Sequence, residues 1–256
     1  EEVAALRTRL RAALPDAQAL LAWTARLPLP ASDQEFTSVA LRDARDYPMY
    51  DGRLVSSAGL DIDVAQYQQH FRELLVPHST ALYSLHDDKP YLVGPLARLH
   101  LNLDRLPVAV RQALDATGMV FPSRNMYHSI VARAVEILLA LTEAIRLLDA
   151  YRVPAASKVS VIPRAGVSCG ATEAPRGVLW HRYEVTGDGR VKSARIVPPT
   201  SQNQARIEED LRASLMEYGL AHSDAELRLR AETVIRNYDP CISCATHFLR
   251  MRIERA

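Results

Sequence analysis

The sequence is poor in cysteine, carries almost no net charge and contains no long uninterrupted apolar run. Only three cysteines occur among 256 residues. An odd number, two of them closely spaced, argues against a disulfide framework and for a reducing compartment, so we predict a cytoplasmic protein. A formal net charge of +1 gives no bulk attraction to nucleic acid or to an anionic membrane.

The longest apolar region, residues 130–151, is interrupted by five charged side chains, which excludes a membrane span. The sequence shows no signal-peptide pattern. It begins with Glu1, inside a helical apolar stripe that no capping residue precedes. We interpret this as part of a longer polypeptide.

The residue pattern predicts one domain over residues 1–256, of the α+β class and predominantly α. Apolar residues at helical spacing predict a bundle around a long central helix from Arg124 to Tyr151, with Ser123 as its N-cap. Alternating residues around Gly187-Asp188-Gly189 predict a peripheral β-hairpin. Further helices are predicted over 1–27, 64–76, 106–117, about 204–218 and 223–237, a loop over 94–100 and irregular chain over 152–175.

Two of the three cysteines lie at Cys-x-x-Cys spacing near the C-terminus, with a histidine three residues further on. Pro240 favours a helix start, so Cys241 should leave a loop and Cys244 and His247 should share one helical face. Thiolates and imidazole together are ligands for soft or borderline metals. Three other interpretations stay open: two reduced structural thiols, a redox dithiol, and a zinc site completed by Cys169.

Several motifs together resemble the C-terminal half of the large subunit of nickel–iron hydrogenases. The resemblance covers essentially the whole chain, and its N-terminal motifs are similar to the cytoplasmic, NAD(P)-linked or sulfhydrogenase-like branch. The motifs are Tyr47-Pro48-Met49 with Gly52-Arg53, residues 91–98 (YLVGPLAR), Glu173 to Gly177 with His181, Pro199-Thr200 with Asn203, and Asp239-Pro240-Cys241-x-x-Cys244-x-x-His247.

The resemblance implies a nickel–iron centre with carbon monoxide and cyanide ligands on iron, and a separate magnesium ion. Cys241 would be a terminal thiolate on nickel, and Cys244 would bridge nickel and iron. His247 would bind the magnesium. A guanidinium or a thiolate would take the proton when hydrogen is split, and the residues alone do not decide between them.

The resemblance also assigns roles around the metals. Arg176 would lie over the open metal position and donate to one cyanide, and Thr200 would donate to the other. Pro175 and Pro199 would shape the apolar pocket for the diatomic ligands. Asp239 would pair with the arginine.

The implied activity is reversible oxidation of hydrogen. Electrons would pass to an iron–sulfur small subunit and on to diaphorase subunits and NAD(P). A maturation endopeptidase would cut after His247, so the tail from Phe248 to Ala256 predicts an unprocessed precursor.

The sequence departs from the family in two respects. The N-terminal Cys-x-x-Cys that completes the metal ligands is absent, and so is the family's upstream glutamate. We therefore expect this polypeptide to be inactive alone. The alternatives are a non-catalytic assembly or respiratory-complex-like subunit of the same fold, and a zinc-binding structural module using Cys169, Cys241, Cys244 and His247.

Overall fold

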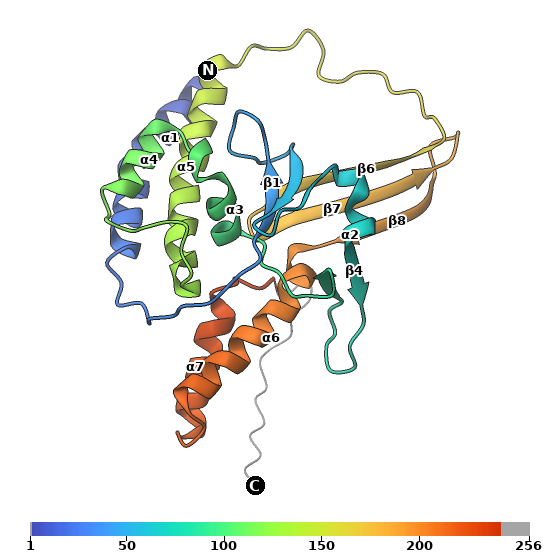
Figure 1. Cartoon of the computed structure of the whole chain (residues 1–256). Coiled ribbons are helices and arrows are strands. Elements are labelled where there is room, and N and C mark those ends of the chain that lie inside the picture. Colours follow the sequence, from blue (N-terminus) through green and yellow to red (C-terminus); the bar gives the residue numbers. More distant parts are fainter. Residues whose placement is uncertain (1, 242–256) are drawn as a thin grey trace.

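The computed structural model describes residues 2–241 and shows a helical part beside small antiparallel sheets (Figure 1). This arrangement confirms the predicted α+β class with helices predominating. The helices are α1 (Glu2–Thr24), α2 (Tyr67–His70), α3 (Pro95–Asn102), α4 (Val108–Asp115), α5 (Ser129–Ala150), α6 (Pro199–Tyr218) and α7 (Asp224–Arg236), with short 3-10 turns at Val64–Gln66, Leu103–Arg105 and Met126–His128.

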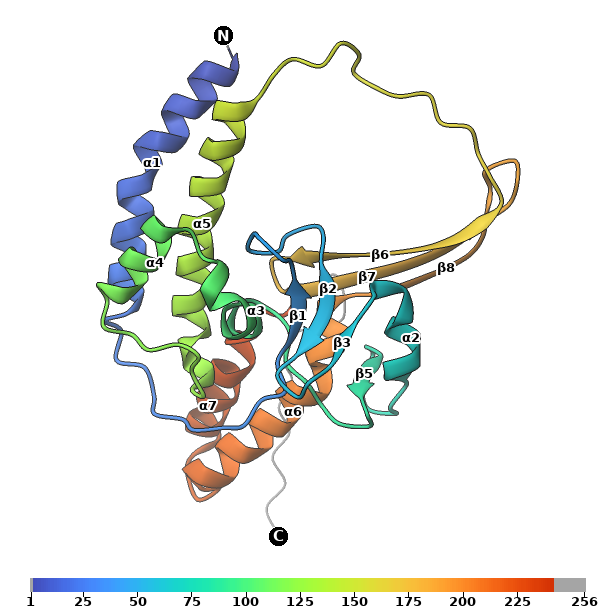
Figure 2. The same ribbon diagram turned by 45° about the horizontal axis from the view of Figure 1, so that its top comes forward.

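The helical core forms around α5, which runs alongside α1 in both views (Figures 1 and 2). Val131, Val135 and Leu138 recur at helical spacing on α5 and are at most 3% exposed. Leu21 of α1 belongs to the same buried cluster. The predicted central, largely buried helix is therefore confirmed.

The strands form three separate antiparallel sheets, which pack beside the helices. A second apolar cluster joins the first and third sheets and includes the fully buried Trp180, stacked on Tyr67. The strands are β1 (Val39–Arg42), β2 (Arg53–Ser56) and β3 (Asp61–Ile62) in the first sheet, β4 (Phe71–Leu74) and β5 (Tyr83–His86) in the second, and β6 (Gly166–Ala174), β7 (Gly177–Val185) and β8 (Val191–Val197) in the third.

The predicted helix over residues 64–76 is wrong beyond His70. Phe71 begins strand β4, which pairs with β5, and its ring stacks on Tyr67 at a centroid distance of 4.4 Å. Tertiary pairing and aromatic packing thus override a weak helical propensity, as they commonly do.

The predicted loop over residues 94–100 is also wrong, because Pro95 is the first residue of helix α3. Proline is well suited to that position, since its missing N–H is not needed there.

The predicted N-cap at Ser123 is displaced as well. A 3-10 turn capped by Asn125 precedes α5, and Ser123 instead hydrogen-bonds His128 at 2.7 Å.

The region 152–175, predicted to be irregular, is irregular only up to about residue 165. Strand β6 then pairs along its whole length with β7, from Gly166 with Val185 to Ala174 with Gly177. The predicted hairpin, formed by β7 and β8, is therefore part of a three-stranded sheet that also contains β6. The Ser223–Glu226 capping box that opens α7 is confirmed. Within residues 2–241, each helix is too short or too polar to traverse a bilayer.

Three partly buried histidines are expected to make stability depend on pH. Burial lowers the pKa of His86, His100 and His128 below the ordinary value. Between these lowered pKa values and the unfolded pKa of about 6.5, the unfolded chain therefore binds more protons than the folded chain. Stability should fall as pH drops through this window, and His128→Gln should flatten the fall in urea unfolding midpoints. An identical pH dependence in wild type and variant would contradict the assignment.

Candidate functional site

Arg176 lies at the tight turn between β6 and β7, and two glycines allow another segment to approach this turn closely. Gly94 has φ +110°, and a Cβ there would lie 2.8 Å from the carbonyl oxygen of Arg176. Gly177 has φ +135°, and a Cβ there would lie 2.5 Å from Cγ2 of Val93. Side chains at either position would push the segments apart, so glycine is required at both.

The guanidinium of Arg176 meets Asp239, sixty-three residues further along the chain. Its Nε lies 3.2 Å from the Asp239 carboxylate and also donates a short hydrogen bond to the Asp239 carbonyl oxygen. The side chains are 34% and 49% exposed, so the pair lies at the molecular surface. The structure thus brings together the arginine motif and the start of the cysteine motif.

Asp239 turns the chain after the end of α7. The backbone N–H groups of Tyr238 and Asp239 bond back to the last turn of the helix, and Asp239 has φ +47°. Aspartate tolerates this left-handed conformation better than β-branched residues do. Cys241, two residues further on, is partly buried and is the last residue described. Cys244 and His247 lie outside the described residues, and their metal-binding roles stay predictions.

A small pocket connects Arg176 to the central helix. It is lined by apolar residues such as Leu96 and Met126, and by Arg133, Arg176 and Tyr238. Arg133 donates to the carbonyl oxygen of Asn237 at 3.0 Å. Burial lowers the pKa of Arg133, while the charge of Asp239 opposes that change. No sequence motif identifies Arg133 as a site residue, although its position on an apolar face of the long helix is a signal.

The first turn of α6 is tied to the same region through Asn203. Its side-chain oxygen accepts from the N–H of Val93 at 2.9 Å, and its Nδ2 donates to the carbonyl oxygen of Val93 at 3.1 Å. Val93 is the residue that abuts Gly177. Pro199 and Thr200, predicted to lie near the metals, open this helix.

The hydroxyl of Thr200 is a buried polar group for which the residues described supply no hydrogen-bond partner. Thr200 is 3% exposed and lies in the first turn of a twenty-residue helix, where backbone N–H groups favour negative charge. Buried polar groups normally have partners, so this hydroxyl fits a missing anionic acceptor. The residues present are therefore compatible with a polar ligand on a metal, as the resemblance implies.

Cys169 does not line the Arg176 pocket. It lies on β6 opposite Arg182 and packs against the apolar cluster of the sheets. Across residues 2–241, no group of three or more His, Cys, Asp or Glu side chains is arranged to hold a metal.

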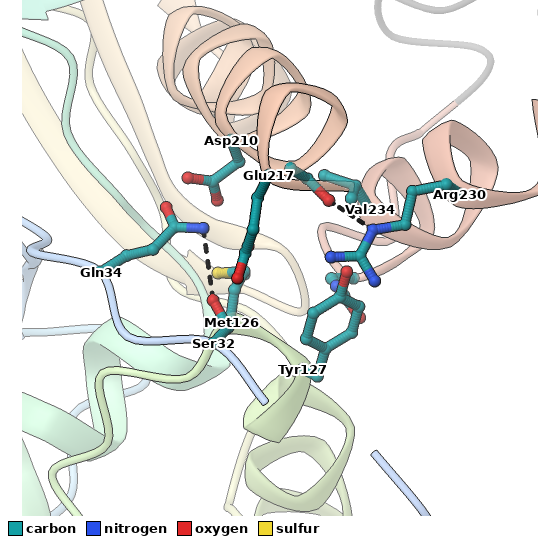
Figure 3. A pocket seen from close by; sticks show the side chains of 10 residues that line it. Ser32, Gln34, Met126, Tyr127, Asp210, Glu217, Arg230 and Val234 are labelled. Atoms are coloured by element: carbon teal, nitrogen blue, oxygen red, sulfur yellow. Dashed lines mark hydrogen bonds between the residues drawn. The ribbon is translucent and has the colours of Figure 1, made fainter. Parts of the chain in front are cut away.

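Hydrogen bonds from the segment that follows α7 to α6 hold the chain just before Asp239. Tyr238, 5% exposed, donates a short hydrogen bond to Asp210, which also accepts from Arg206. Asp210 borders a polar hollow between the two helices, where Arg230 lies over the ring of Tyr127 (Figure 3). These contacts hold the residue immediately before Asp239.

Removing the Thr200 hydroxyl should leave the metal-free chain no less stable. Thr200→Val is nearly isosteric and deletes a buried polar group without a partner, so we expect the free energy of unfolding to stay unchanged or rise by about 1 kcal/mol. Thr200→Ser, which keeps the hydroxyl but opens a methyl-sized void, should lower it. Urea unfolding of both variants tests this, and a loss on Thr200→Val larger than on Thr200→Ser would show that the hydroxyl is bonded within the chain.

Comparison with known proteins agrees with this geometry. A model of the nickel-dependent hydrogenase family matches residues 79–247. Sulfhydrogenase 1 subunit alpha of Pyrococcus furiosus is 32% identical over 251 residues, covering 96% of this chain and 58% of that protein. NAD-reducing hydrogenase HoxS subunit beta of Cupriavidus necator is 31% identical over 208 residues, covering 74% of this chain and 41% of that protein.

A solved structure described as an NAD+-reducing NiFe-hydrogenase in the H2-reduced state shares the fold. Its TM-score is 0.76 at 26% identity, covering 96% of this chain and 60% of that one. The chain thus spans about three fifths of the length of this structure and of the Pyrococcus relative. The family match includes the Arg176–Asp239 pair, whose charged groups lie 3.2 Å apart, and Cys241, two residues further along the chain. The chain belongs to the nickel-dependent hydrogenase family.

Proposed function

We propose that this chain is the C-terminal portion of the catalytic subunit of a nickel–iron hydrogenase that oxidises H2 reversibly. The observation that carries the proposal is the contact between Arg176 and Asp239, 3.2 Å apart and two residues before Cys241. This contact places the Arg176 guanidinium beside Asp239, the residue with which the predicted thiolate motif begins. Relatives named as sulfhydrogenase and NAD-reducing hydrogenase subunits support the same reaction class.

A nickel–iron pair, held by Cys241, Cys244 and thiolates from outside this sequence, would supply the heterolytic splitting of H2. Arg176 would donate to an anionic ligand of the metals, with Asp239 holding its Nε. Thr200 would donate its hydroxyl to a second such ligand, which we assign as cyanide. The Cys241 sulfur is the proton acceptor we favour, because an arginine guanidinium stays protonated in proteins. His247 would bind the magnesium.

The complete enzyme needs further chains in this proposal. An iron–sulfur small subunit would take the electrons, and diaphorase subunits would pass them to NAD(P). A maturation endopeptidase would remove the residues after His247, and assembly would take place in the reducing cytoplasm. The relative named as an NAD-reducing hydrogenase subunit supports NAD(P) as the electron acceptor in this proposal.

The test is to produce the chain together with an N-terminal segment that supplies the paired cysteines and with a small subunit. Nickel and iron in equal amounts, with H2-dependent dye reduction, are the expected result. Cys241→Ser should lose nickel, whereas Cys169→Ser should keep it. Zinc alone would favour the structural module, and no metal in the assembled complex would favour the non-catalytic relative.

A further inference from the structure

Arg98 of helix α3 is a buried guanidinium that makes contacts on all sides. Its side chain is only 5% exposed. Nε and Nη2 donate to the two carboxylate oxygens of Glu136 at 2.7 and 2.6 Å, in the forked geometry that arginine shares with carboxylates. Nη1 donates to Glu173 at 2.9 Å. Arg98 thereby links α3, α5 and the end of β6.

The remaining contacts of Arg98 reach the backbone immediately before Arg176. Nη1 donates to the carbonyl oxygen of Ala174 at 2.8 Å, and Nη2 donates to that of Pro175 at 3.0 Å. These two peptides form the turn that carries Arg176. One side chain thus binds two consecutive carbonyl groups of the site loop as well as two acidic side chains.

The two carboxylates are themselves held in place. Tyr47 donates to Glu136 at 2.8 Å, and the backbone N–H of Leu41 donates to Glu173 at 2.7 Å. The Glu173 side chain is 1% exposed. A buried cluster in which each member has partners is rigid, because shifting any of them leaves an unpaired charge.

The Arg98 cluster continues toward Asp239 through helix α5. Glu136 lies three residues after Arg133, and the charges of Glu136 and Asp239 both act on the Arg133 guanidinium. Arg133 in turn holds the carbonyl oxygen of Asn237, two residues before Asp239. Both sides of the Arg176–Asp239 pair are therefore tied to neighbouring positions of one rigid helix.

We propose that Arg98 is a positioning residue that fixes the peptide preceding Arg176, so that this guanidinium meets Asp239 beside the thiolate segment. The effect on H2 turnover rests on the proposed function, whereas the effect on the loop does not. A role in stability alone leaves two of the contacts unexplained. Pairing with Glu136 and Glu173 requires neither of the hydrogen bonds that Arg98 donates to the Ala174 and Pro175 carbonyl groups.

The experiment compares Arg98→Lys and Arg98→Met with the control Thr24→Val in the assembled complex. Thr24 is 2% exposed and its hydroxyl donates to the carbonyl oxygen of Leu21 at 2.9 Å, so this control also removes a buried hydrogen bond, but on α1 rather than beside the Arg176 loop. Hydrogen–deuterium exchange is followed on peptides covering 172–178 and, for comparison, 205–217. Lysine keeps the charge but lacks the planar fork, so it should not restore the wild-type loop.

For both Arg98 variants we expect exchange in 172–178 to become about tenfold faster, with 205–217 unchanged. H2 turnover should fall roughly 100-fold while nickel and iron contents stay at the wild-type level. The control should change neither the loop peptide nor turnover. Wild-type loop exchange in the Arg98 variants, or acceleration equal in both peptides, would overturn the proposal.

The two proposals fail in different ways. A wild-type complex without nickel and without H2 turnover would reject the proposed function, and the exchange comparison would still decide the role of Arg98. If the Arg98 variants do not fold, Glu173→Gln provides the milder change. It keeps the shape of the side chain, but its amide has one acceptor oxygen in place of two, so it can no longer accept both from Leu41 and from Nη1. Exchange in 172–178 should therefore rise several-fold, and an unchanged rate would overturn the proposal.

Discussion

Arg176→Lys in the assembled, metal-loaded enzyme is expected to lower H2 turnover by about 100-fold or more, the cost typical of losing one preorganised donor at a reacting centre. The Arg176 Nε is committed to Asp239 at 3.2 Å, and the planar guanidinium carries two further nitrogen donors on the same rigid group. Lysine has a single ammonium on a flexible stem, so it cannot hold Asp239 and reach a metal ligand in the same fixed geometry.

The metal content should not change, because Arg176 is not a ligand in the proposed site. Nickel and iron analysis beside dye-linked H2 oxidation therefore separates this role from one in assembly. Arg182→Lys is the matched control, since Arg182 lies on the adjoining strand β7 and contacts only Ser193, at 3.4 Å, through its side chain among the bonds described. Equal turnover in the two variants, or loss of nickel on Arg176→Lys, would contradict the assigned role.

Much of this site was predictable because its parts are local in sequence. The arginine motif, the Pro199-Thr200 pair and the cysteine motif are each short and compositionally unusual, and together they resemble the nickel–iron hydrogenase family, which implies a metal centre. Their contact is not local. Gly94 and Gly177 let residues 93 and 94 pack against the turn that carries Arg176, and α7 ends where Asp239 can reach that turn.

The residues that sequence reasoning missed act through tertiary contacts. Arg98 ends the YLVGPLAR motif without an assigned role, and it is buried because its acidic partners come from α5 and β6. Arg133 looked like an interruption of an apolar helix, and it instead donates to the end of α7. Neither pairing has a sequence pattern of its own. The misplaced strand β4 has the same origin, since its partner strand and its aromatic neighbour decide its conformation.

Asp210→Ala is expected to be strongly destabilising, with a loss of about 3 kcal/mol in the free energy of unfolding, at the lower end for breaking a buried ion pair. The Asp210 side chain is 1% exposed and accepts from both Arg206 and Tyr238. Its removal leaves a guanidinium that is only 12% exposed and a buried hydroxyl without this partner. Arg206 keeps its contacts to Gln34 and Glu209, which limits the loss.

Urea unfolding measures the loss, and Glu232→Ala is the control. Glu232 forms an i,i+4 pair with Arg236 on α7, with side chains 31% and 74% exposed, so its removal should cost less than about 1 kcal/mol. Because Tyr238 is the residue before Asp239, Asp210→Ala should also loosen the chain leading into the thiolate motif, seen as faster amide exchange at the end of α7. Equal urea midpoints in the two variants would show that Asp210 does not hold the end of α7 against α6.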